Sequence, residues 1–132
     1  MTRAIRDMRP VTIAVVHGFA IGGALLLMLS CDLRIATKGS FFSIPEVDMG
    51  IPLAWGGIPT LVSEIGPAKT KELVMTCRRF SAAEAFEMGL LNRLCEEGEQ
   101  NEISSSLARD LHAKPNVPLL YTKEQVLSLI HI

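Results

Sequence analysis

An apolar run broken by glycines most constrains how this chain can fold. Val11–Val16 is apolar and rich in β-branched residues, and the pair Gly22 and Gly23 separates it from the apolar segment Ala24–Cys31. β-branched residues favour strands, and glycines before a long apolar run are typical of a turn that leads into a buried helix. The pattern predicts a buried strand, a tight loop and the start of a buried helix.

The glycine turn and one nearby carboxylate indicate a type of chemistry. Glycines at such a junction let backbone N–H groups approach a carbonyl oxygen, and the helix N-terminus adds a partial positive charge. Glu46 follows Pro45 in a weakly charged region. Amide donors for an oxyanion and an isolated carboxylate together favour proton abstraction next to a carbonyl group. On spacing alone, a simple tight turn at the glycines and an ordinary turn carboxylate at Glu46 stay open.

Composition narrows the class of protein. The 132 residues are 48% hydrophobic and 20% charged, which is typical of one globular core. A net charge of −1 and the lack of a basic run argue against a nucleic-acid partner. The three cysteines are far apart and show no metal-ligand spacing, so we expect no metal site and mostly buried, reduced thiols. A soluble protein of the cytosol or of an organelle matrix, mitochondrial or peroxisomal, fits these features.

A membrane span is the alternative interpretation of the apolar run. Val11–Ser30 carries no formal charge over twenty residues, and Gly18-x-x-x-Gly22 is spaced like a helix-packing motif. The first half is β-branched, however, His17 lies in the middle, and adjacent glycines weaken a spanning helix. We therefore expect no membrane span.

Alternating strand and helix signals in the rest of the chain predict an α/β fold. Further strands are expected at 32–36, 41–44 and 90–95, and further helices at 58–65, 67–77, 102–113 and 119–130. Pro67 suits a first helical position, and Ser81 with Glu84 forms a capping box for another helix, which Gly89 ends. The acidic segment 96–102 is predicted to be a solvated loop, and 115–118 a break between the last two helices.

Short motifs also follow one another in a distinctive order. They are Arg9-Pro10-Val11, His17–Gly23, Cys31–Ala36, Phe42–Glu46, Gly50-Ile51-Pro52, Gly56-Gly57, Ala68–Leu73, Arg79–Ala85 and Met88–Asn92. Their order and spacing resemble the crotonase superfamily, the enoyl-CoA hydratases and isomerases. The resemblance covers 9–95 well and 96–126, a C-terminal helical part, more loosely, and 127–132 is an unassigned tail. It implies a crotonase-like α/β fold with a spiral ββα core, present over 1–132 as a single, incomplete domain.

The resemblance also implies a site. Glu46 matches the acid/base residue of the family, and Gly23 matches one of two backbone donors that stabilise the enolate of an acyl-CoA thioester. Coenzyme A is then part of the substrate, and no separate cofactor is needed. The residues expected to contact substrate are Gly22, Ala24, Leu26, Ala54 and Trp55.

One departure from the family pattern affects the expected reaction. Hydratases of the family carry a second glutamate at the position of Leu26, and an aliphatic side chain cannot polarise water. We therefore expect an enoyl-CoA isomerase that uses Glu46 alone. A hydratase, another crotonase-type lyase or decarboxylase, and a catalytically inactive piece that acts through oligomer contacts stay open.

The remaining expectations concern neighbours and assembly. His17 is expected to be a buried, hydrogen-bonded turn residue, and Asp48 a rim charge. Trp55 fits either the acyl pocket or the core. Family members are longer and hold their other oxyanion donor in an N-terminal half. The resemblance also implies a homo-oligomer, a trimer or hexamer, for the full-length protein.

Overall fold

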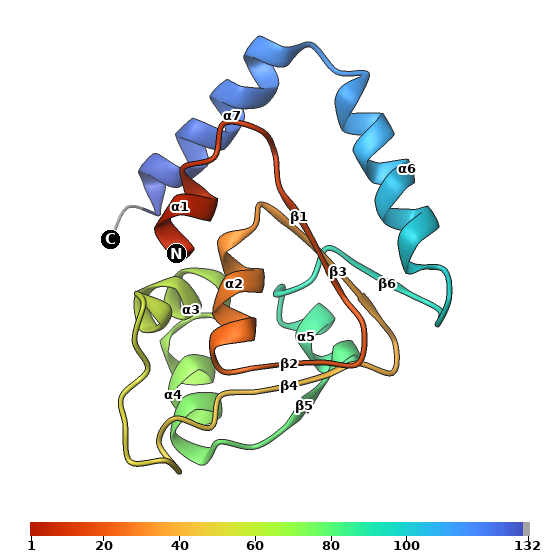
Figure 1. Cartoon of the computed structure of the whole chain (residues 1–132). Coiled ribbons are helices and arrows are strands. Elements are labelled where there is room, and N and C mark those ends of the chain that lie inside the picture. The colour runs from red at the N-terminus through yellow and green to blue at the C-terminus, as the bar shows by residue number, and fades with distance from the viewer. Residues whose placement is uncertain (131–132) are drawn as a thin grey trace.

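Two small sheets lie at the centre of the computed structural model, which describes residues 1–130 (Figure 1). In the first sheet, β1 (Ile13–Val16), β3 (Leu33–Thr37) and β6 (Arg93–Cys95) are parallel, in the order β1-β3-β6. In the second, β2 (Phe19–Ile21) pairs in parallel with β4 (Phe41–Ser43), and β4 pairs antiparallel with β5 (Phe80–Ser81).

The chain winds through these sheets as a repeated unit. β1 and β2 lie in different sheets and lead into a helix, and β3 and β4 repeat the pattern. The helices are α1 (Thr2–Arg6), α2 (Gly23–Ser30), α3 (Gly57–Ile65), α4 (Pro67–Thr76), α5 (Ala82–Glu87), α6 (Gln100–His112) and α7 (Asn116–Leu129). The expected α/β fold with a spiral ββα core is confirmed.

The core lies between the sheets and the helices that follow them. Its fully buried side chains include Leu25 of α2, Phe42 of β4, Leu61 of α3 and Leu73 of α4. A second, smaller cluster of Ile35, Cys95 and Leu107 holds α6 against β3 and β6. Figure 1 shows α6 and α7 joined at an angle, with α1 beside the C-terminal end of α7.

Most predicted elements are present, with shifted ends. The strand predicted at 11–16 and the helix at 24–31 correspond to β1 and α2. Pro67 begins α4, and the Ser81 hydroxyl caps α5 by accepting a hydrogen bond from the Glu84 N–H at 3.1 Å. Gly89, with a φ of 89°, follows the end of α5 as expected.

Three local expectations were wrong. The segment after Gly18 is not only a loop, because β2 forms by pairing with β4. The acidic segment 96–102 already enters α6 at Gln100, and α7 begins at Asn116, so Pro118 lies in its first turn. A proline is tolerated there because the first helical N–H groups have no partner within the helix.

The cysteines are free, but only Cys95 is buried, whereas Cys31 and Cys77 are half-buried, so the expectation of mostly buried thiols was wrong. Burial raises the pKa of the Cys31 and Cys95 thiols. None of the helices within residues 1–130 is long and apolar enough to cross a membrane. The same residues contain no group of three or more His, Cys, Asp or Glu side chains that could hold a metal ion. The last two residues of the unassigned tail, His131 and Ile132, lie outside the described residues.

Candidate active site

A glycine turn connects β2 to the N-terminus of α2. Gly22 has φ 56° and ψ −116°, its N–H donates to the carbonyl of Ser43 at 3.0 Å, and its carbonyl accepts from the N–H of Leu26 at 3.2 Å. Gly22 therefore shapes the turn, and its own N–H is already used. Gly23 is the first residue of α2, where an N–H has no acceptor within the helix. The Gly23 N–H is therefore a free donor at this turn, as the first N–H of α2.

Glu46 lies directly against this turn. The residue follows the end of β4 by three positions, and its side chain is buried, with the residue 8% exposed. Its carbonyl accepts hydrogen bonds from the N–H groups of Met49 and Ile51, both at 3.0 Å, which fixes the backbone that carries the carboxylate. The Glu46 Oε1 atom lies 2.8 Å from the position that a Cβ atom at Gly22 would take. Only glycine leaves room for the carboxylate here.

The other carboxylate oxygen has no partner. Glu46 Oε2 is buried and accepts no hydrogen bond from any atom of residues 1–130. A buried, unsatisfied carboxylate oxygen is costly, because the group has lost water without gaining a donor. A buried group of this kind in a native structure calls for an explanation, and a functional role is one of them. The structure thus brings an unoccupied N–H at Gly23 and an unoccupied carboxylate oxygen at Glu46 to one turn.

Trp55 forms one side of this turn. Its indole Cζ3 and Cη2 atoms lie 3.0 and 3.3 Å from the position that a Cβ atom at Gly23 would take. The residue is 54% exposed, so it is not a core anchor. Its φ of 57° is in the left-handed region, which costs a bulky residue roughly 1–2 kcal/mol.

The family model for enoyl-CoA hydratase/isomerase matches residues 1–128. The chain belongs to this family. The resemblance to the crotonase superfamily is thereby confirmed.

Two curated relatives illustrate the range of the family. The chain is 39% identical over 120 residues to the short-chain-enoyl-CoA hydratase of Clostridioides difficile, an alignment that covers 91% of the chain and 77% of the relative. It is 35% identical over 127 residues to the peroxisomal Delta(3,5)-Delta(2,4)-dienoyl-CoA isomerase of Arabidopsis thaliana, covering 94% of the chain and 45% of the relative.

Solved structures match the fold closely. An enoyl-CoA hydratase subunit of Geobacillus kaustophilus superposes with a TM-score of 0.95 at 34% identity, over 99% of the chain and 51% of the neighbour. A putative enoyl-CoA hydratase of Thermobifida fusca in complex with acetoacetyl-CoA gives a TM-score of 0.91 at 32% identity, over 97% and 50%. The chain thus spans about half the length of these two solved structures.

In this member of the enoyl-CoA hydratase/isomerase family, Leu26 belongs to the core. Its side chain is 4% exposed, and Leu26 and Leu53 lie 2.8 Å from the position that a Cβ atom at Gly57 would take. The close packing requires glycine at Gly57, the first residue of α3. The Leu26 side chain of α2 is therefore apolar and packed tightly against the start of α3.

The remaining predicted contact residues, Ala24 and Ala54, are both exposed. Ala24 is exposed and lines a shallow, mainly apolar depression of about 360 Å³ together with Val15 and Phe19. Ala54 is exposed, and its carbonyl accepts the N–H of Gly57 at 3.0 Å. Asp48 is exposed, in keeping with a rim charge.

His17 is exposed, whereas the sequence predicted a buried turn residue. Its side chain is 62% exposed, and its Nε2 atom lies 2.7 Å from Oε2 of Glu97. The residue is hydrogen-bonded, but it is not buried, because the turn after β1 faces the loop between β6 and α6. Glu97 was missed because it is eighty positions away in sequence.

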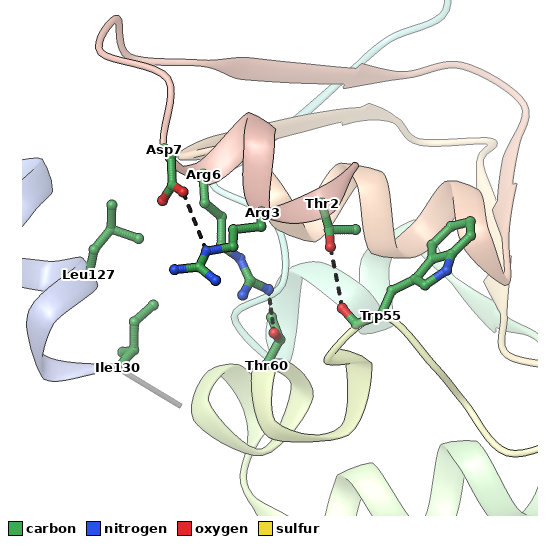
Figure 2. A pocket seen from close by; sticks show the side chains of 8 residues that line it. All are labelled: Thr2, Arg3, Arg6, Asp7, Trp55, Thr60, Leu127 and Ile130. Atoms are coloured by element: carbon green, nitrogen blue, oxygen red, sulfur yellow. Dashed lines mark hydrogen bonds and ion pairs between the residues drawn. The ribbon is translucent and has the colours of Figure 1, made fainter.

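A cavity of about 310 Å³ lies between α1, α3 and α7, on the backbone side of Trp55 (Figure 2). Thr2 Oγ1 donates to the carbonyl of Trp55 at 3.3 Å, and Arg6 bonds to the hydroxyl of Thr60. Sequence reasoning missed these contacts because it assigned no structure to residues 1–8. Figure 2 shows the indole pointing away from the cavity while the carbonyl faces Thr2.

Proposed function

We propose that this family member acts on an acyl-CoA thioester, with Glu46 as the acid/base. The supporting observation is the buried Glu46 Oε2, which has no hydrogen-bond partner among the described residues and lies at the turn that carries the free Gly23 N–H. The Thermobifida fusca neighbour, in complex with acetoacetyl-CoA, supports the substrate class.

The proposed step moves one proton and shifts electron pairs along the acyl chain. The Glu46 carboxylate takes a proton from the carbon next to the thioester carbonyl, the C–H electron pair forms a double bond to the carbonyl carbon, and the carbonyl π pair moves onto the oxygen. The Gly23 N–H donates a hydrogen bond to that oxyanion, and one such donor typically lowers a barrier by about 3 kcal/mol. Protonated Glu46 then returns the proton at C4 of a 3-enoyl chain, which moves the double bond to the 2-position.

Leu26 favours isomerisation over hydration. Hydration needs a second polar group that orients and activates water, and the Leu26 side chain is buried against α3. Isomerisation needs only one carboxylate that removes and returns the same proton. The second candidate function is a hydratase in which another part of the protein supplies the acid, and the hydratase names among the relatives favour it.

The homo-oligomer, a trimer or hexamer, stays a prediction that sedimentation can test.

The test compares two reactions and two variants of the native protein that carries this sequence. We expect 3-enoyl-CoA isomerisation to be much faster than 2-enoyl-CoA hydration. Glu46→Gln should lower kcat by about 10²–10⁴-fold without preventing substrate binding, because glutamine keeps the size but cannot accept a proton.

Asp48→Asn is the matched control, because it removes an exposed carboxylate two residues away. Its kcat should stay within a few-fold of the parent. A hydration rate equal to the isomerisation rate would refute the isomerase assignment. A Glu46→Gln variant with near-parental kcat, beside an inactive Asp48→Asn variant, would refute the choice of base.

A further inference from the structure

The backbone at Trp55 is held in a conformation that an indole side chain disfavours. Trp55 has φ 57°, and Gly56, which follows it, has φ 70°. Glycine adopts this region freely, whereas a bulky residue in it is an outlier. Strained residues of this kind persist where the surroundings hold them, and they cluster at ligand sites.

The strain is not offset by burial of the indole. More than half of the residue is exposed. One contact holds its backbone, the hydrogen bond from Thr2 Oγ1 to its carbonyl. The indole edge meanwhile lies 3.0 and 3.3 Å from the position that a Cβ atom at Gly23 would take, which is a tight contact. The residue therefore places the edge of an aromatic ring against Gly23, the first residue of α2.

An acyl group bound at the Gly23 N–H lies beside the residue that the indole edge contacts. A thioester oxygen within hydrogen-bond distance of Gly23 N–H places the neighbouring carbon next to the same residue. A flat, unbranched acyl group can lie against an aromatic surface. A methyl branch at that carbon needs volume next to the indole edge.

We infer that Trp55 is a specificity-determining residue, whose indole admits unbranched acyl groups to Gly23 and excludes those branched at the carbon next to the thioester. The inference rests on the proposed function, since it takes the Gly23 N–H as the donor to the thioester oxygen.

Two isomeric, unreactive probes test this inference on the native protein. Butanoyl-CoA is unbranched, and 2-methylpropanoyl-CoA carries the branch next to the thioester. Calorimetry on the parent should give about tenfold tighter binding of butanoyl-CoA, in the range that a single misplaced methyl group produces. In Trp55→Asn, where asparagine tolerates the left-handed conformation, the ratio should fall below about threefold, and in Trp55→Phe it should lie between the two.

Fluorescence gives an independent readout, because Trp55 is the only tryptophan among these 132 residues. The emission difference between the parent and Trp55→Phe isolates its signal, which butanoyl-CoA should shift and free coenzyme A should not. Tyr121→Ala, at an exposed aromatic residue of α7, is the control and should leave the binding ratio unchanged.

The outcomes separate the two claims. Failure of the parent to bind either probe would refute the proposed function and this inference with it. Equal binding of both probes by the parent would refute the inference alone. Urea unfolding gives the last criterion: Trp55→Asn should be as stable as the parent, and a large loss of stability in both Trp55 variants would make Trp55 a structural anchor instead.

Discussion

α2, which carries the Gly23 N–H, and α7 differ in how much of each helix is buried. α2 is short, and five of its residues are buried: Leu25, Leu26, Met28, Leu29 and Ser30. α7 is longer and has no buried residue, with Val117 79% and Leu129 87% exposed. Its polar attachment is Lys123, whose ammonium donates to the carbonyls of Met8 at 2.7 Å and Pro10 at 2.8 Å and pairs with Asp32 at 2.8 Å.

The difference shows what each kind of contact can do. Close packing of its buried face fixes α2, so its first N–H is held in place relative to Glu46. α7 is held by the polar contacts of Lys123 and by half-buried leucines, so it has far fewer buried apolar contacts than α2. Regions with few buried apolar contacts open locally at low free-energy cost.

The largest expected effect comes from breaking the packing of α2. Leu25 is fully buried, so Leu25→Ala should lower the free energy of unfolding by about 2–5 kcal/mol. The matched control is Leu129→Ala in α7, which should change stability by no more than about 0.5 kcal/mol. Urea unfolding of both variants measures the contrast, and equal losses would show that α7 is packed as firmly as α2.

A smaller and more local effect is expected from Lys123→Met. The substitution keeps most of the stem but removes the donor to two carbonyls and the partner of Asp32. Losing about 1.5 kcal/mol of charge-assisted bonding should speed hydrogen exchange in α7 about tenfold. Amides of α2 should keep their parental rates. Faster exchange in both helices would mean that the two regions unfold together.

The smallest effect concerns ionic contacts at the surface. Arg78 bonds to Glu72 and Glu84, and these hydrogen bonds lower the pKa of both carboxyls. A lowered folded-state pKa adds stability above the ordinary carboxyl pKa, and this stability is lost as the pH falls through the lowered value. Because the groups are partly exposed, the gain is small.

Arg78→Ala should therefore be slightly less stable than the parent at neutral pH. The difference should vanish in acid, where the carboxyls are protonated. Urea midpoints measured across the pH range check this sign, and a difference that grows in acid would contradict it.

The same contrast explains how much of the fold the sequence predicted. β1 and α2 were predictable because burial makes their residues apolar over a whole element. α1 was not, since its five residues are held by distant partners such as Thr60, which forms a hydrogen bond with Arg6. β2 was missed because three residues carry too little pattern, and only pairing with β4 makes them a strand.

The candidate site was predictable in its parts and not in its geometry. The glycine turn and Glu46 stand out as residue types, and the structure places Glu46 against Gly22. The missing partner of Glu46 Oε2 and the left-handed backbone of Trp55 depend on contacts across the fold, which no local pattern encodes. His17 was misplaced for the same reason, because its partner Glu97 comes from a distant loop.

The parallel pairing of β3 with β6 cannot form until the ribosome has made both strands. Arg34 and Asn92, which bond to each other across this pair, are separated by 58 positions. At about 5–20 residues per second, the ribosome delivers the second partner roughly 3–12 s after the first. During that interval β1 can already pair with β3, but the other edge of β3 and its share of the smaller core cluster stay open. Until β6 and α6 have been made, Ile35 therefore lacks the Cys95 and Leu107 side chains that cover it in the folded structure.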